Sequence, residues 1–119
     1  MDSPAFCYLT TTGRRTGRPH TIEIWFVVVG PTAYLMAGGR ERADWVRNLM
    51  ANADVSLRVG SEWWPASGRV VDEGTPEDAE ARRLMLAKYS TPGRGDLDSW
   101  GRSALVVAID VPDWSANTT

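Results

Sequence analysis

The sequence is poor in the residues that build covalent cross-links and metal centres. Its 119 residues include one cysteine, Cys7, and one histidine, His20. A single cysteine excludes an intramolecular disulfide, and the two residues together are too few for a cysteine- or histidine-based zinc site, so we expect no metal. Cys7 lies in the apolar run Phe6-Cys7-Tyr8-Leu9. We interpret it as a buried structural thiol, because free cysteine is among the most buried residue types.

Long apolar segments and a strong charge imbalance are also missing. The longest apolar run, Ile22 to Val29, includes Glu23 and is far shorter than the roughly 20 residues of a membrane-spanning helix. The sequence therefore predicts a soluble, cytoplasmic protein. A formal net charge of −2 gives no reason to expect nucleic acid as a partner. Peripheral contact with a membrane stays open at this point, as does the choice between a monomer and a homodimer.

The periodicity of the apolar residues predicts a mainly β fold with two helices. A length of 119 residues and a hydrophobic fraction of 43% indicate a single packed domain spanning residues 1–119. Hairpins predominate over βαβ units, which favours a six-stranded antiparallel barrel with its helices outside. The predicted strands are Phe6–Leu9, His20–Val29, Ala33–Ala37, Val55–Val59, Glu62–Val71 and Ala104–Ile109, the predicted helices are Ala43–Ala51 and Pro76–Tyr89, and the residues from Pro112 onward are predicted to form a tail.

An arginine-rich loop between the first two predicted strands is the most informative stretch. Residues 10–20 read TTTGRRTGRPH and hold three arginines, two glycines and four threonines, with no acid from Ser3 to Ile22. Guanidinium groups match the geometry of phosphate and carboxylate oxygens, and a glycine-bearing loop exposes backbone N–H donors. The stretch is therefore interpreted as an anion-binding loop, with a solvated hairpin tip as the alternative.

A second candidate anion site precedes the first predicted helix. Ala37-Gly38-Gly39-Arg40-Glu41-Arg42 leads directly into that helix, whose first N–H groups would suit a phosphate. An ordinary strand-to-helix loop is the alternative. Two arginine-bearing loops close in sequence favour one shared anionic ligand. Neither a G-x-G-x-x-G motif nor a Walker motif is present, so phosphate would be bound by another route.

Three ordered motifs resemble the deazaflavin (coenzyme F420)-dependent nitroreductase family, a flavin and deazaflavin oxidoreductase group with a split β-barrel fold. They are LTTTGRRTGRP at 9–19, Ala37-Gly38-Gly39, and DWVRNLMANADV at 44–55. The ending Ser99-Trp100 followed by ALVV at 104–107 is also similar. The resemblance covers Leu9 to Ile109, and its joined pattern T-T-G-R-x-[ST]-G-x-P with W-x-x-N-L-x-A-N is specific.

The resemblance implies a reduced deazaflavin as hydride donor, a coenzyme with a phosphodiester and an acidic tail. Its phosphate side would be held by Arg14, Arg15, Thr16 and Gly17 with help from His20. The ring system would lie against Ile22 and Ile24. Phosphate and linker would contact Ala37, Gly38, Gly39, Arg40, Asp44, Trp45 and Asn48. The substrate side would include Trp25, Tyr89 and Trp100.

The hydride acceptor implied by the resemblance is an unsaturated or quinonoid small molecule. Because the coenzyme carries the reactive carbon, no catalytic protein nucleophile is required, and none is recognised in the sequence. Two other readings stay open. One is a non-catalytic module that binds the deazaflavin or a fatty acyl ligand, and the other is a split-barrel protein that uses FMN or haem.

Overall fold

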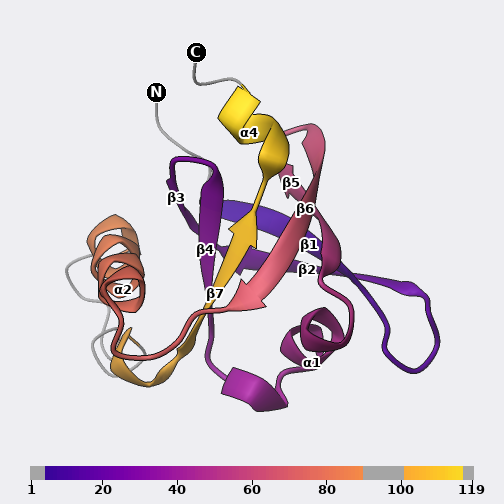
Figure 1. The fold of residues 1–119 in the computed structure, drawn as a ribbon, viewed down its shortest axis with the longest axis horizontal. Coiled ribbons are helices and arrows are strands. Elements are labelled where there is room, and N and C mark those ends of the chain that lie inside the picture. Colours follow the sequence, from indigo (N-terminus) through magenta and orange to yellow (C-terminus); the bar gives the residue numbers. More distant parts are fainter. Residues whose placement is uncertain (1–4, 90–100, 117–119) are drawn as a thin grey trace.

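A single curled antiparallel sheet forms the body of the protein (Figure 1). The computed structural model describes residues 5–89 and 101–116. In this part of the chain seven strands pair in the order β2-β1-β5-β6-β7-β4-β3. They are β1 (Phe6–Thr12), β2 (Pro19–Trp25), β3 (Val27–Val29), β4 (Thr32–Ala37), β5 (Asp54–Val59), β6 (Glu62–Val70) and β7 (Leu105–Asp110).

The sheet curls into a half-barrel because its two edge strands are consecutive in the chain. β2 and β3 lie at opposite ends of the strand order, yet only Phe26 separates them in sequence. The Phe26 N–H donates to Tyr89 Oη at 3.0 Å, and Lys88 Nζ donates to the Phe26 carbonyl at 2.7 Å. These bonds hold the corner where the strand breaks. The predicted single strand His20–Val29 is therefore two strands, and the predicted six strands become seven.

Two main helices lie outside the half-barrel, as predicted. The hydrophobic core has two parts, one inside the barrel and one between the sheet and α2. Helix α1 (Asp44–Ala51) packs against β1 and β6, and helix α2 (Pro76–Tyr89) packs against β3 and β7. Strands β4 and β7 are buried on both faces, because alternate residues point into the barrel and under α2. The barrel interior includes Leu9, Leu35, Leu57, Val107 and Ile109, and the layer beneath α2 includes Met36, Ala81, Met85 and Val106.

Several local predictions can be compared with these elements. Cys7 is fully buried, as predicted. An acid within an apolar run, such as Glu23, is expected to be a solvated carboxylate on the outer face of its strand. Glu23 is indeed exposed, and it accepts a hydrogen bond from Tyr8 Oη at 2.5 Å. The helical spacing of Val46, Leu49 and Met50 predicts that all three lie on one apolar face, but Met50 is 62% exposed. The predicted tail after Pro112 begins with a short helix, α4 (Pro112–Ala116).

Candidate functional site: a pocket between an arginine loop and helix α1

The loop between β1 and β2 is a closed turn that projects beside α1 (Figure 1). The Gly13 N–H donates to the Arg18 carbonyl at 2.7 Å, and the Gly17 N–H donates to the Gly13 carbonyl at 2.8 Å. Gly17 has a φ of 71°, which glycine adopts at little cost. A Cβ on Gly13 would lie 2.7 Å from His20 Nε2. The glycines of the motif therefore permit both the turn and the close approach of the histidine ring.

One buried amide joins this loop to α1. Asn48 is 5% exposed, and its Oδ1 accepts from the Arg14 backbone N–H at 3.2 Å and from the Arg14 guanidinium at 2.9 Å. Its Nδ2 donates to Thr11 Oγ1 at 3.3 Å. The guanidinium of Arg14 also forms an ion pair with Asp44 at 3.2 Å. Three elements, β1, the loop and α1, thus meet at Asn48.

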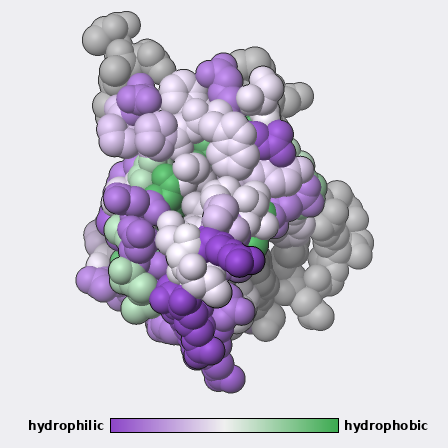
Figure 2. Space-filling view, turned by 90° about the vertical axis from the view of Figure 1, so that its right-hand side faces the viewer, coloured by the Kyte–Doolittle hydropathy of each residue, from purple (hydrophilic) through white to green (hydrophobic). Residues whose placement is uncertain are grey.

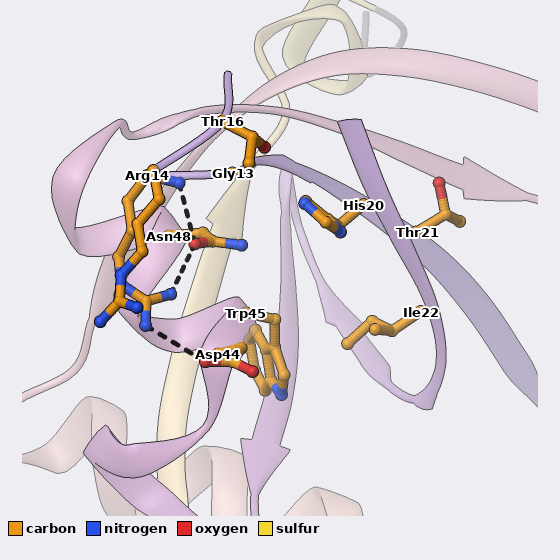
Figure 3. A pocket seen from close by; sticks show the side chains of 10 residues that line it. Gly13, Arg14, Thr16, His20, Thr21, Ile22, Asp44, Trp45 and Asn48 are labelled. Atoms are coloured by element: carbon orange, nitrogen blue, oxygen red, sulfur yellow. Dashed lines mark hydrogen bonds and ion pairs between the residues drawn. The ribbon is translucent and has the colours of Figure 1, made fainter. Parts of the chain in front are cut away.

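A pocket with a volume of about 450 Å³ lies between the loop, β2 and the start of α1. Figure 3 shows residues of all three elements around it, with the interactions among Arg14, Asp44 and Asn48 as dashed lines. The side of the molecule from which the loop projects is mainly hydrophilic, with only small hydrophobic areas (Figure 2). The pocket is lined by Gly13, Arg14, Arg15, Thr16, His20, Thr21, Ile22, Asp44, Trp45 and Asn48.

The start of α1 is suited to an anion. Its N-cap residue, Ala43, forms no side-chain cap hydrogen bond. By contrast, α2 is capped by Thr75, whose Oγ1 accepts from the Asp78 N–H at 3.2 Å. The first N–H groups of a helix have no partner within the helix and carry its positive dipole end. An uncapped helix start beside arginines therefore offers donors to a negatively charged group.

Eight of the predicted cofactor-binding residues line this pocket together: Arg14, Arg15, Thr16, His20, Ile22, Asp44, Trp45 and Asn48. Gly17 lies in the same loop but does not line the pocket, and Ile24 lies farther along β2, half-buried against the barrel core. Sequence reasoning missed Gly13 and Thr21. The position of Gly13 within the T-T-G-R motif is a signal that could have indicated it.

The diglycine loop lines a separate cavity with a volume of about 390 Å³. The residues that line it are Gly38, Gly39, Arg40, Glu41 and Arg42. Its residues Arg40–Arg42 form the short helix η1, which contacts α1, and the start of α1 lines the first pocket. The Arg40 guanidinium is bound to Glu73, Glu41 and the Ser103 carbonyl. Ala37 lies in the barrel core at 2% exposure. The two predicted loops thus flank the same helix without sharing one pocket.

Two of the three predicted substrate-side residues, Trp25 and Tyr89, lie at the corner of the barrel. Trp25 stacks on Tyr89 with ring centroids 4.3 Å apart and planes within 3°. Tyr89 Oη lies 2.6 Å from the carbonyl of Ala5, and burial raises the pKa of this phenol. Trp100 lies outside the described residues. Within residues 5–89 and 101–116, no group of His, Cys, Asp and Glu side chains could hold a metal ion.

Comparison with known proteins identifies the family. The family model of F420H(2)-dependent quinone reductases matches residues 2–112. The chain belongs to the F420H(2)-dependent quinone reductase family. An F420H(2)-dependent quinone reductase of Mycobacterium tuberculosis is 29% identical over 86 residues, which cover 70% of this chain and 58% of the relative. The chain thus matches less than two thirds of that relative's length.

Solved structures show the same fold. The structure of an F420-H2 dependent reductase (FDR-A) superposes with a TM-score of 0.72 at 21% identity, covering 89% of this chain and 94% of that chain. HutZ, the heme storage protein from Vibrio cholerae, superposes with a TM-score of 0.73 at 16% identity, covering 90% of this chain and 81% of that chain. The split-barrel architecture predicted from the motifs is confirmed. None of the helices in the described part of the chain has the length and hydrophobicity of a transmembrane span.

Proposed function

We propose that this protein is a deazaflavin-dependent reductase that binds reduced coenzyme F420 in the pocket beside α1 and reduces a quinone or another unsaturated small molecule. Family membership supports the coenzyme and the reaction class. The observation that carries the proposal is the meeting of an exposed Arg15 with the uncapped start of α1 in one pocket. Such a site fits the phosphodiester of the coenzyme by charge and by hydrogen-bond donors.

The residues around the pocket divide into polar and apolar parts that suit such a ligand. Arg15, Thr16 and His20 would face the phosphate, and the apolar side chain of Ile22 would face the ring system. When bound, the reduced coenzyme supplies the hydride, so the protein's own work is to bind, orient and exclude water. Arg14, Asp44, Trp45 and Asn48 complete the wall of the proposed pocket. Further proposed contacts with the coenzyme, outside that pocket, are Gly17, Ile24, Gly38, Gly39, Arg40 and the backbone of Ala37, whose side chain is buried. Trp25, Tyr89 and Trp100 are proposed for the substrate side.

Reversing the charge of Arg15 tests the binding site. Arg15→Glu should weaken coenzyme binding about 10- to 100-fold, because an acid then lies a few ångströms from the phosphate in a partly desolvated pocket. Titration of the coenzyme's fluorescence gives the dissociation constants. Arg83→Glu is the matched control, since it makes the same charge change at an exposed position of α2. Equal affinities of Arg15→Glu and the unmodified protein would refute the pocket as the site.

Turnover separates an enzyme from a binding module. If the protein is a quinone reductase, it should oxidise F420H2 only when a quinone such as menadione is added. The absorbance of the coenzyme measures this oxidation. Binding of the coenzyme without quinone-dependent oxidation would instead support a module that only binds it. FMN titrated in the same way tests the alternative cofactor, which the proposal expects to bind more weakly.

A further inference from the structure

Arg14 and Arg15 are neighbours in sequence, but their guanidinium groups have different surroundings. The Arg14 side chain is 22% exposed. Its guanidinium is engaged by Asn48 and Asp44, and its backbone N–H also reaches the Asn48 amide. Arg15 is exposed and has no ion pair within residues 5–89 and 101–116. The charge of Arg14 is therefore largely committed to contacts within the protein, whereas that of Arg15 is available to a ligand.

The loop has few other attachments that would hold it over the pocket. β2 is an edge strand, so its outer side has no neighbouring strand in the sheet. The backbone bonds from Gly13 to Arg18 and from Gly17 to Gly13 close the turn on itself without fixing it to the rest of the molecule. The Arg14 contacts with Asn48 and Asp44, which cross 34 and 30 positions of sequence, are what join the turn to α1.

We propose that Asn48 is a positioning residue that acts through Arg14. Its buried amide accepts both the backbone N–H and the guanidinium of Arg14 and so holds the loop against α1, which presents Arg15 to the pocket. The identity of the ligand rests on the proposed function, but the attachment of the loop does not. A loop released from α1 spends less time in the binding conformation, and apparent affinity falls in proportion to that fraction.

Thr11 offers a matched control for a merely structural role. Thr11→Val removes the oxygen that accepts from Asn48 Nδ2 and leaves both Arg14 contacts in place. It perturbs the same buried amide and should lower Tm, because a buried donor loses its partner. Asn48→Ala also lowers Tm, but in addition it removes both bonds that Arg14 makes to the Asn48 amide and leaves only the ion pair with the exposed Asp44. The two variants therefore separate loss of stability from loss of positioning.

The experiment measures two quantities for Asn48→Ala, Arg14→Ala, the double variant and Thr11→Val. The first is hydrogen exchange of residues 13–18 in the ligand-free protein, and the second is the dissociation constant of coenzyme F420. Asn48→Ala and Arg14→Ala should each raise the exchange and weaken binding by about tenfold. The double variant should also lose about tenfold rather than a hundredfold, because each single change already removes the bond between the Arg14 guanidinium and the Asn48 amide. Thr11→Val should leave exchange and affinity unchanged.

Each outcome bears on one of the two proposals. Unchanged loop exchange in Asn48→Ala would overturn the positioning role, as would additive losses of affinity in the double variant. If Asn48→Ala does not fold, Arg14→Ala still removes the guanidinium bonds to Asn48 and Asp44 and keeps only the backbone bond to the amide. Unchanged exchange in that variant would also overturn the role. Failure of the unmodified protein to bind the coenzyme would remove the proposed function, while the exchange data would still decide whether Asn48 holds the loop.

Discussion

Gly68 on β6 lies directly beneath α1, and enlarging it by one methyl group should displace the helix that carries the pocket. A Cβ at this position would lie 2.2 Å from Leu49 Cδ1 and 2.6 Å from Leu49 Cγ. Leu49 is 1% exposed and packed in the barrel core, so it has little space into which to move. Overpacking of this kind costs about 1–3 kcal/mol.

The expected loss can be expressed as a melting temperature. An unfolding entropy of about 2.1 cal/mol/K per residue makes 1 kcal/mol worth about 4 °C in a chain of this length. Gly68→Ala should therefore lower Tm by about 4–12 °C in a thermal melt followed by circular dichroism. The variant should also bind the coenzyme less tightly, because Asp44, Trp45 and Asn48 line the pocket from the same helix.

Two further variants decide whether the clash with Leu49 is the cause. Gly39→Ala adds the same methyl group where its nearest neighbour is an ordinary 3.6 Å away, so Tm should change little. Leu49→Ala alone should cost about 2–5 kcal/mol, but Gly68→Ala combined with Leu49→Ala should cost less than the sum, because the new methyl group occupies the space vacated. Strictly additive losses, or a Gly68→Ala protein as stable as the unmodified one, would refute this account of the packing.

Two other predictions concern titratable groups away from the pocket. The pKa of Glu77 is lowered from 4.5 to about 2 by hydrogen bonds from Arg69 and Tyr34, so its contribution to stability is complete above pH 4.5 and is lost as the pH falls towards 2. Solvent screening limits this contribution to about 1 kcal/mol, and urea unfolding of Glu77→Gln should show a weaker loss of stability over that pH range. Burial raises the pKa of Cys7 to about 12, so the native protein should resist a thiol reagent at pH 8 that modifies the urea-unfolded protein fully. Rapid modification of the native protein would contradict the burial.

Helices and strands that follow a local sequence pattern could be predicted from the sequence. The break between β2 and β3 at Phe26 could not, because it depends on contacts with residues far along the chain. Helix α2 begins at Pro76 and ends at Tyr89 as its cap and periodicity indicate. The break at Phe26 was missed because the apolar run continues through it. Only the contacts of Phe26 with α2, more than 60 positions away, reveal the corner. Helix α4 did carry a local signal, since proline at a first helical position followed by Asp113 favours a helix start.

The position of Met50 shows where a periodic pattern is too coarse. Spacing placed Met50 beside Leu49 on one apolar face, yet Leu49 is 1% exposed and Met50 is 62% exposed. Helix α1 has eight residues and rests on β6, where Gly68 receives Leu49. Because Gly68 leaves space for the Leu49 side chain, the helix can pack against β6 through a narrow apolar stripe that does not include Met50. Gly68 lies 19 positions after Leu49 in the chain. No window of helical length contains that information.

Arginines that bind a ligand and arginines that hold the fold look alike in sequence. Both loops beside α1 were predicted as anion sites because each contains guanidinium groups. In each loop, one of these arginines is bound to other residues of the protein. Arg14 is bound to Asn48 and Asp44, and Arg40 to Glu73, Glu41 and the Ser103 carbonyl. Arg15 in one cavity and Arg42 in the other are exposed and form no ion pair among the described residues. A guanidinium that already has its carboxylate gains less from a phosphate, because the new contact must replace an existing one. The charge that a ligand meets is therefore set by the pairing of each arginine rather than by the number of arginines in a loop.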